Sequence, residues 1–181
     1  MIFVAIDPGL SGAVAALDEN GNIIALQETP TLLVKKGKKN RHVYVPSAMK
    51  CLLEPLKQIS LVCITERNPL TQLPITDGDY EPVLLTLENV HAMPGQGVTS
   101  MFSMGRGLGL WEGIAITLGF PLQYVEPVVW KRAMQIPTGS GKGASVVRAA
   151  QLFPTAGLRY KNEDGKADAL LIAEYARRQR K

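Results

Sequence analysis

Hydrophobic residues at the start of the chain come in short runs that turn residues separate. Residues 2–6 are all apolar, which predicts a buried strand, and the turn that follows would leave the Asp7 carboxylate at the strand's open end. Residues 12–17 and 22–28 predict two further strands, because the Asn20-Gly21 pair between them is a strong two-residue hairpin signal. The chain is therefore expected to begin with an antiparallel meander.

Strand and helix patterns alternate through the rest of the chain. Residues 83–87 are mostly apolar and run into Glu88, which predicts another strand with a carboxylate at its end. Residues 46–59 have apolar positions at helical spacing, and Pro55 within them is expected to kink or split that helix. Residues 68–81 are rich in turn residues and predict an inserted loop. The other predicted strands are 61–65 and 122–125, and the other predicted helices are 100–118, 128–134, 143–153 and 164–178.

Composition limits the class of protein. The chain has 181 residues, 46% of them hydrophobic and 20% charged, so we expect one domain, residues 1–181, with a sizeable core. No apolar stretch approaches the ~18 residues of a membrane span, and no basic leader segment precedes the first strand. Cys51 and Cys63 form neither a disulfide framework nor a metal-ligand spacing. We expect a protein of the cytoplasm or another reducing intracellular compartment, not secreted and with no membrane partner.

The basic residues are bunched rather than spread. The net charge is +4, and residues 177–181 form one basic segment. The other basic segment is a predicted loop, and its cationic residues are Lys35, Lys36, Lys38, Lys39 and Arg41. Such segments suit a polyanionic partner, although each alone is equally typical of a solvated loop or tail.

Four carboxylates stand where a divalent metal site would want them. Asp7 and Glu88 each end a predicted strand, and Asp164 and Asp168 lie four residues apart on one face of the last helix. Carboxylates gathered in one place repel unless a cation neutralises them, and hard oxygen ligands suit Mg²⁺ or Mn²⁺. The first hypothesis is a two-metal nuclease. Glu66 also ends an apolar segment, 61–65, and competes with Glu88 as the second strand ligand.

Ordered motifs along the chain resemble a known family. Asp7-Pro8-Gly9, with Gly12 close behind, is similar to the first strand of the RNase H-like superfamily, and the later motifs narrow the resemblance to the RuvC-type Holliday junction resolvases. These motifs are Glu88-Asn89-Val90, Ser103-Met104-Gly105-Arg106-Gly107, residues 124–131 and Gly165-Lys166-Ala167-Asp168-Ala169-Leu170. The loop 91–97 looks more like the phage and organellar members than the bacterial enzyme. Each motif alone is weak, whereas the ordered set is specific.

The resemblance implies a fold and an activity. The fold would be α/β, with an RNase H-like mixed five-stranded sheet flanked by helices. The activity would be a structure-selective endodeoxyribonuclease that resolves four-way DNA junctions as a homodimer in a DNA-containing compartment. Two Mg²⁺ (or Mn²⁺) ions per active site would support hydrolysis that leaves 5′-phosphate and 3′-hydroxyl ends. Paired cuts on a two-fold junction match a two-fold dimer.

The family's functional residues transfer to this chain one by one. Its three best-defined acids fall on Asp7, Glu88 and Asp168. The fourth acid lies three residues before the last in bacterial RuvC, but Gly165 occupies that position here; a spacing of four selects Asp164, with Glu163 as the fallback. The residues expected to contact DNA, beyond the basic segment, are Lys131, Lys142, Met93 and Gln96.

Several other features have a plain and a functional interpretation. Gly105, Gly109 and Gly113 recur on a predicted helix, where each costs about 1 kcal/mol relative to alanine. A close approach to the sheet is the favoured explanation, and the same helix of a second subunit is the alternative. Phe102 is expected in the core rather than in a DNA junction, and His91 is more typical of a loop residue than of a general acid or metal ligand.

The sequence leaves two alternative functions open and argues against two others. A nuclease of the same fold could act on RNA/DNA hybrids or flaps, and a protein with an inert site could bind junctions without cutting them. The turn at 139–142 superficially resembles a phosphate-binding loop, but Ile136 and Gly143 depart from that motif. The start of the chain also resembles actin-like sugar kinases, which need two such domains; 181 residues leave no room for them.

Overall fold

A mixed five-stranded sheet forms the centre of the molecule in the computed structural model, which describes residues 1–37, 39–61, 82–92, 95–141, 143–159 and 161–180. Its strands are β1 (Ile2–Ile6), β2 (Ala13–Leu17), β3 (Ile23–Glu28), β6 (Val83–Glu88) and β7 (Leu122–Val125), in the order β3-β2-β1-β6-β7. Strands β1 to β3 are antiparallel, and β6 and β7 run parallel to β1. The predicted meander is therefore confirmed.

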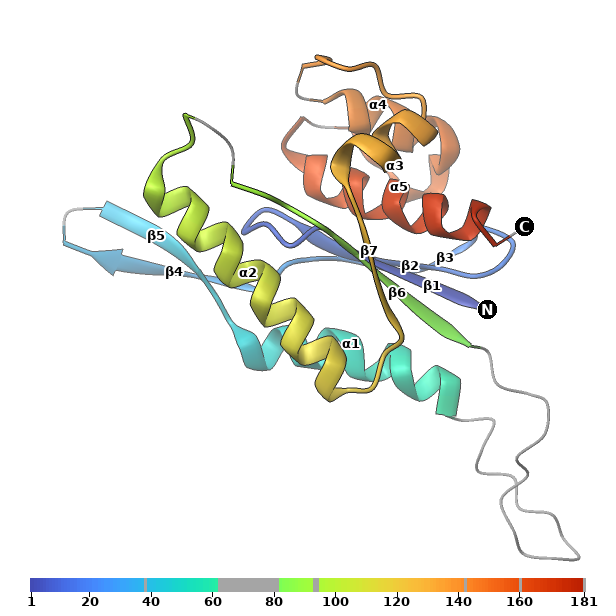
Figure 1. Cartoon of the computed structure of the whole chain (residues 1–181), viewed down its shortest axis with the longest axis horizontal. Helices are drawn as coiled ribbons and strands as arrows, with labels where there is room; N and C mark the ends of the chain where they lie inside the picture. Colours follow the sequence, from blue (N-terminus) through green and yellow to red (C-terminus); the bar gives the residue numbers. More distant parts are fainter. Residues whose placement is uncertain (38, 62–81, 93–94, 142, 160, 181) are drawn as a thin grey trace, which may run out of the picture.

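Helices cover both faces of the sheet (Figure 1). Two of them, α1 (Pro46–Leu61) and α2 (Val98–Thr117), pack on one face. Three others, α3 (Pro127–Ala133), α4 (Ala144–Leu152) and α5 (Asp164–Arg178), pack on the opposite face. Short 3₁₀ turns at Pro154–Ala156 and Lys161–Glu163 join the last two helices. The sheet thus lies between two large hydrophobic cores, and Phe3, Leu84 and Ala176 form a smaller third cluster.

Alternation along the strands decides which face each strand-end acid occupies. On β1, Val4 and Ile6 pack in the core under α1 and α2, whereas Ala5 packs in the core under α5. Because successive side chains point to opposite faces, Asp7 follows Ala5 onto the α5 side. Leu87 of β6 lies opposite Ile6 and shares its core, so Glu88 also lies on the α5 side, beside Asp7.

Glycines let two helices dock closely on the turn that follows β1. A Cβ atom at Gly165, near the start of α5, would overlap the Ser11 carbonyl oxygen. A Cβ atom at Gly107 of α2 would overlap both the Tyr44 hydroxyl and the Pro8 carbonyl oxygen. The Tyr44 hydroxyl donates a hydrogen bond to that carbonyl at 3.2 Å. These contacts fix the turn and with it the Asp7 carboxylate.

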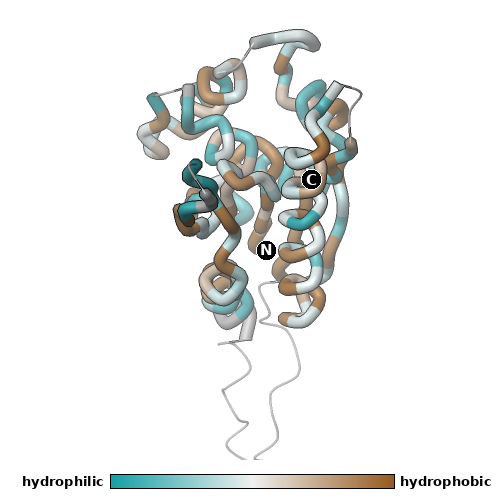
Figure 2. Tube along the Cα trace, turned by 90° about the vertical axis from the view of Figure 1, so that its left-hand side faces the viewer, coloured by the Kyte–Doolittle hydropathy of each residue, from teal (hydrophilic) through white to brown (hydrophobic). Residues whose placement is uncertain are grey.

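The basic segment is a β-hairpin, where the sequence had predicted a loop. Strands β4 (Thr31–Lys36) and β5 (Lys39–Tyr44) pair antiparallel over six positions, and Gly37 between them has a φ of 66°. The dominance of lysine masked the β-branched and aromatic residues that favour a strand here. The hairpin projects from the body (Figure 1) and is strongly hydrophilic towards its outer end (Figure 2).

One further expectation changes, and three others cannot be placed. Helix α1 continues across Pro55 to Leu61, so the proline does not split it; Leu53 and Leu56, buried on either side, keep the helix packed on the sheet. The predicted strand 61–65, the competing acid Glu66 and the predicted loop 68–81 lie outside the described residues, apart from Leu61 itself. None of the helices in the described part of the chain is both long and apolar enough to cross a membrane.

Candidate active site

The four candidate acids converge on the α5 side of the sheet. Asp7 and Glu88 end adjacent parallel strands, and α5, which carries Asp164 and Asp168, packs across β1 and β2. The negative charge of Asp7 acts on both Glu88 and Asp168, and Asp164 acts on Asp168. Residues separated by more than 150 positions are therefore electrostatic neighbours.

Asp7 is held by the turn that follows it. Its Oδ1 atom accepts a hydrogen bond from the Gly9 amide at 3.1 Å. Burial raises the pKa of the Asp7 carboxyl group, while the Gly9 amide and the positive charge of Lys131 act in the opposite direction. The aspartate is thus oriented in an environment that penalises its charge.

Glu88 is buried and has an indole as its hydrogen-bond partner. Its side chain is only 6% exposed, and its Oε1 atom accepts a hydrogen bond from Trp130 Nε1 at 2.8 Å. Burial, followed by the charge of Asp7, raises the pKa of Glu88 to about 8. Without a nearby cation, this carboxyl group would be largely protonated at neutral pH.

Asp168 has one oxygen atom without a partner. Burial raises its pKa to about 6, against the opposing effect of a hydrogen bond from the Ser145 hydroxyl. Its Oδ1 atom is buried and accepts no hydrogen bond. An unsatisfied buried carboxylate oxygen is costly, so this atom is suited to a ligand from outside the chain.

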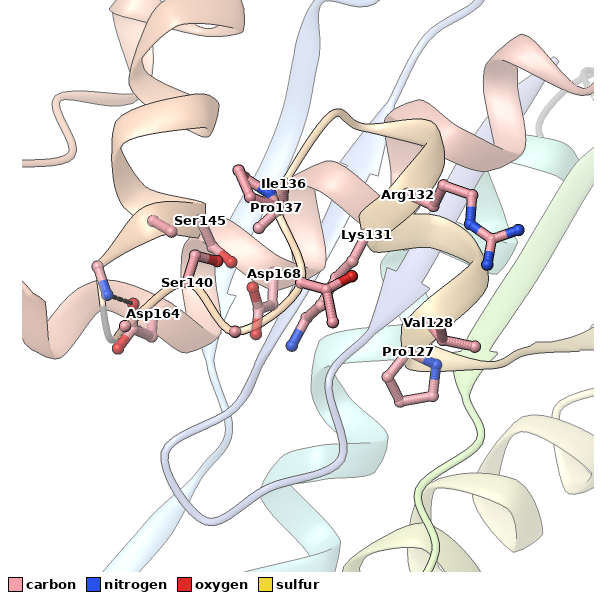
Figure 3. A pocket seen from close by; sticks show the side chains of 15 residues that line it. Pro127, Val128, Lys131, Arg132, Ile136, Pro137, Ser140, Ser145, Asp164 and Asp168 are labelled. Carbon is pink, nitrogen blue, oxygen red and sulfur yellow. Dashed lines mark hydrogen bonds between the residues drawn. The ribbon is translucent and has the colours of Figure 1, made fainter.

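Asp164 and Asp168 both line a cavity of about 430 Å³ beside the sheet (Figure 3). Its walls come from α3, the turn at 136–141, and the first turns of α4 and α5. The Asp164 Oδ1 atom accepts a hydrogen bond from the Gly143 amide at 3.0 Å. The Lys131 side chain reaches from α3 towards Asp168, whereas Arg132 points away (Figure 3).

The geometry separates the two candidates for the fourth acid. Gly165 has no room for a side chain, so an acid could not stand at that position in this chain. Asp164 opens into the cavity that Asp168 shares. Glu163 accepts a hydrogen bond from the Arg159 amide at 2.8 Å and borders a different hollow, with Lys166. The position of Asp164 favours it over Glu163.

The four candidate acids have the type of donor atom that a hard divalent cation prefers. Among the residues that the structure describes, no three Asp, Glu, His or Cys side chains stand close enough to hold a metal ion as they are placed. The four acids nevertheless offer only hard oxygen donors, and one of these is the unpaired Asp168 Oδ1 atom. A cation would also offset the repulsion and burial that raise the pKa values of Glu88 and Asp168.

Sequence reasoning missed three residues around the acids. Trp130 is fully buried, and an indole in that position needs an acceptor, so its place directly before Lys131 was a usable signal. Glu126 follows β7 as Asp7 follows β1, yet its carboxylate accepts hydrogen bonds from Asn89 and His91. Nothing in the sequence pattern marked Ser145 as the partner of Asp168.

Only part of the predicted DNA-binding set can be placed. Lys35, Lys39 and Arg41 are exposed on the β4–β5 hairpin, and Lys36 belongs to β4. Gln96 directs its amide at the Met104 sulfur atom, at 4.0 Å. Lys38, Met93 and Lys142 lie outside the described residues.

Two expectations about α2 were wrong. Phe102 is 75% exposed near the start of the helix rather than packed in the core, and Val98 one turn earlier is 77% exposed. Gly105, Gly109 and Gly113 do not approach the sheet, since a Cβ atom added at any of them would meet nothing within 4 Å. The hydrophobic pattern of α2 could not tell a buried apolar face from an exposed one.

Comparison with known proteins agrees with the motifs. No family model matches the chain. Over 108 residues the chain is 38% identical to the chloroplastic Holliday junction resolvase MOC1 of Chlamydomonas reinhardtii; the match covers 55% of this chain and 12% of that relative. The structure of Thermus thermophilus RuvC in complex with a Holliday junction substrate aligns with 99% of this chain and 95% of its own, with 14% identity and a TM-score of 0.53. A second Thermus thermophilus RuvC structure aligns with 99% of this chain and 96% of its own, with 16% identity and a TM-score of 0.48. The resemblance to RuvC-type resolvases and the RNase H-like fold class are confirmed.

Proposed function

We propose that this chain is a structure-selective endodeoxyribonuclease that resolves four-way DNA junctions, with residues 1–181 acting as one nuclease domain. The observation that carries the proposal is the convergence of Asp7, Glu88 and Asp168 beside the positive charge of Lys131 on a RuvC-type fold. The relative in Chlamydomonas is named a Holliday junction resolvase, and RuvC has been solved with a junction, which supports the choice of substrate. A reducing compartment that contains DNA is its proposed location.

The acids would hold two Mg²⁺ or Mn²⁺ ions, with Asp7, Glu88, Asp164 and Asp168 as the ligands. Such ions, when bound, lower the pKa of an attacking water and offset the negative charge that develops on the phosphate, for hydrolysis to 5′-phosphate and 3′-hydroxyl ends. The protein's own part is to orient the oxygens: the Gly9 amide holds Asp7, the Trp130 indole holds Glu88, and the Ser145 hydroxyl holds Asp168. Lys131 supplies positive charge beside them for a DNA phosphate.

The DNA would extend from this site along positively charged surfaces. The β4–β5 hairpin offers exposed Lys35, Lys39 and Arg41, and Lys36 and Lys38 belong to the same basic segment. Lys142 would hold a DNA phosphate, and Met93 and Gln96 would meet the opened centre of the junction. The exposed ring of Phe102, close in sequence to that loop, becomes a second apolar candidate for contact with unstacked bases.

Two cuts on one junction require two active sites, and α2 offers a surface for pairing. Gly109 and Gly113 border an apolar groove of about 290 Å³ together with Leu110 and Ile114. Small residues on an exposed helix face allow the backbone of another helix to approach closely. We therefore place a two-fold homodimer contact on this face of α2.

A substrate panel tests the function directly. The purified protein with Mg²⁺ would be incubated with end-labelled four-way junction, linear duplex, flap and RNA/DNA hybrid of matched sequence. The junction is expected to be nicked well ahead of the other three. Preferential cleavage of the hybrid or the flap would move the function to another RNase H-like nuclease. Tight junction binding without cleavage in Mg²⁺ or Mn²⁺ would leave a binding protein with an inert site.

A further inference from the structure

Glu126 stands at a junction between two elements that carry the candidate active site. It follows β7 directly and precedes α3, with extended backbone angles. Its Oε1 atom accepts a hydrogen bond from Asn89 Nδ2 at 2.7 Å, and His91 Nε2 lies 3.0 Å from its Oε2 atom. These hydrogen bonds lower the pKa of Glu126, so the group is held as an anion although it is exposed.

The side chain is diverted from the role that its position favours. A residue at the N-cap of a helix ordinarily accepts hydrogen bonds from the first amides of that helix. Glu126 occupies the N-cap of α3 but makes no such bond with its side chain. Its carboxylate reaches across to the segment that leaves β6, so the contact joins two elements rather than finishing one.

The two joined segments both act on Glu88. Asn89 follows Glu88 directly, and its amide continues the β6–β7 ladder by donating to the Val125 carbonyl oxygen at 2.9 Å. On the other side, the Trp130 amide donates to the Glu126 carbonyl oxygen at 3.3 Å, and the Trp130 indole donates to Glu88. The next residue, Lys131, places its positive charge on Asp7, Glu88 and Asp168.

The contact between His91 and Glu126 is better suited to orienting neighbouring groups than to stabilising the whole fold. The side chains of His91 and Glu126 are 63% and 42% exposed. Exposed ion pairs contribute little to the free energy of unfolding. A misplacement of about 1 Å at catalytic groups, in contrast, can cost about 100-fold in rate.

We propose that Glu126 and His91 are a positioning pair that sets where Glu88 stands relative to Trp130 and Lys131, an inference that rests on the proposed nuclease function. Neither residue contacts the candidate acids in the described structure; both act through Asn89 and α3. The pair braces the open ends of β6 and β7, the two strands on one edge of the sheet.

Kinetics on a four-way junction test the pair as a unit. His91→Ala and Glu126→Ala are each expected to lower kcat about 10-fold, with junction affinity in the absence of divalent ions changed less than about twofold. The double variant should be no slower than the slower single variant, because the two side chains serve one contact. His91→Gln, which keeps an N–H donor, should recover most of the rate. Tyr124→Phe is the matched control and should leave kcat unchanged. It removes an exposed hydrogen bond that the Tyr124 hydroxyl, on β7, donates to Glu112.

Unchanged kcat in both single variants, or a 100-fold loss of kcat in the double variant, would overturn the proposal that the two residues act as a positioning pair. A loss of junction affinity in place of kcat would make His91 a DNA contact instead and would equally overturn it.

A spectroscopic readout keeps this inference separate from the nuclease proposal. The two tryptophans give two indole N–H resonances: Trp130, bonded to Glu88, and Trp111, buried on α2 with its Nε1 atom unpartnered. His91→Ala and Glu126→Ala should both move the Trp130 resonance and leave that of Trp111 in place. An unmoved Trp130 resonance would overturn the positioning role even in an active enzyme. Absence of any wild-type cleavage, with the Trp130 shift present, would instead reject the nuclease and retain the brace.

Discussion

Asp7, Glu88 and Asp168 are carboxyl groups that the fold brings together, Glu88 buried and the other two half-buried, and the pKa of each is raised. Protons and divalent cations therefore compete for the same oxygens. A raised carboxyl pKa in the folded state means that the folded protein binds more protons than the unfolded chain between the two pKa values. Stability must then fall as the pH rises through that window.

Glu88 gives this linkage its clearest test. Its pKa of about 8 lies above the ordinary value of 4.5, so metal-free protein should lose stability as the pH rises from about 4.5 to 8. Glu88→Gln removes the charge and keeps the shape, and it should be more stable than the wild type at pH 8 by roughly 1–3 kcal/mol. Urea unfolding at pH 5 and pH 8 measures the difference, which should shrink at pH 5. A Glu88→Gln variant that is less stable than the wild type at pH 8 would contradict the buried, repelled state of this acid.

The fourth acid can be decided by a matched pair of substitutions. Asp164→Asn should lower cleavage at saturating junction by at least about 100-fold, because it removes the proposed metal ligand at the cavity that Asp168 also lines. Glu163→Gln should cleave within about threefold of the wild type, since its carboxylate faces a separate hollow. Single-turnover rates on one junction measure both, and the reverse order of effects would assign the ligand to Glu163.

At the scale of elements, strand ends and helix starts were predictable where the hydrophobic pattern was strong. The hydrophobic runs that end at Asp7 and Glu88 predicted β1 and β6 and placed two acids at the same end of the sheet. The apolar middle of 164–178 predicted α5 with the bounds that the structure shows. The β4–β5 hairpin was not predictable in this way, since the charged residues hide its alternation. Pairing of Glu88 with Trp130, and of Asp168 with Ser145, depends on how α3 and α4 pack and leaves no local pattern.

The hairpin should contribute to DNA affinity mainly through charge. Lys39→Ala and Arg41→Ala are each expected to weaken junction binding and to reduce the slope of log affinity against log salt by about one. Lys57→Ala is the control, because its ammonium group already donates to the Gly119 carbonyl oxygen at 2.9 Å. Titrations at several salt concentrations measure the slope. Equal slopes in all four proteins would place the DNA path away from the hairpin.

At the scale of the whole molecule, the proposed homodimer depends on the exposed glycine face of α2. A Cβ atom at Gly109 would meet no other part of the described chain within 4 Å, and replacement of a helical glycine favours the helix by up to about 1 kcal/mol. Gly109→Leu should therefore leave the monomer folded while it blocks the approach of a second α2.

Sedimentation of the wild type should give about twice the monomer mass, and Gly109→Leu should sediment as a folded monomer that still unfolds in one cooperative thermal transition. A wild type that stays monomeric on junction DNA, or a Gly109→Leu variant that remains dimeric, would contradict an interface on this face.

We propose that the candidate acids, held in place by paired elements, cut two strands of one junction. Mapping of the nicks on a four-way junction labelled in each strand, followed by treatment with DNA ligase, tests it most directly. Wild-type protein with Mg²⁺ should give paired nicks at symmetry-related positions that ligase seals without further processing, and Asp7→Asn should bind the junction yet leave it intact. Unpaired nicks, ends that ligase cannot join, or undiminished cleavage by Asp7→Asn would contradict the account.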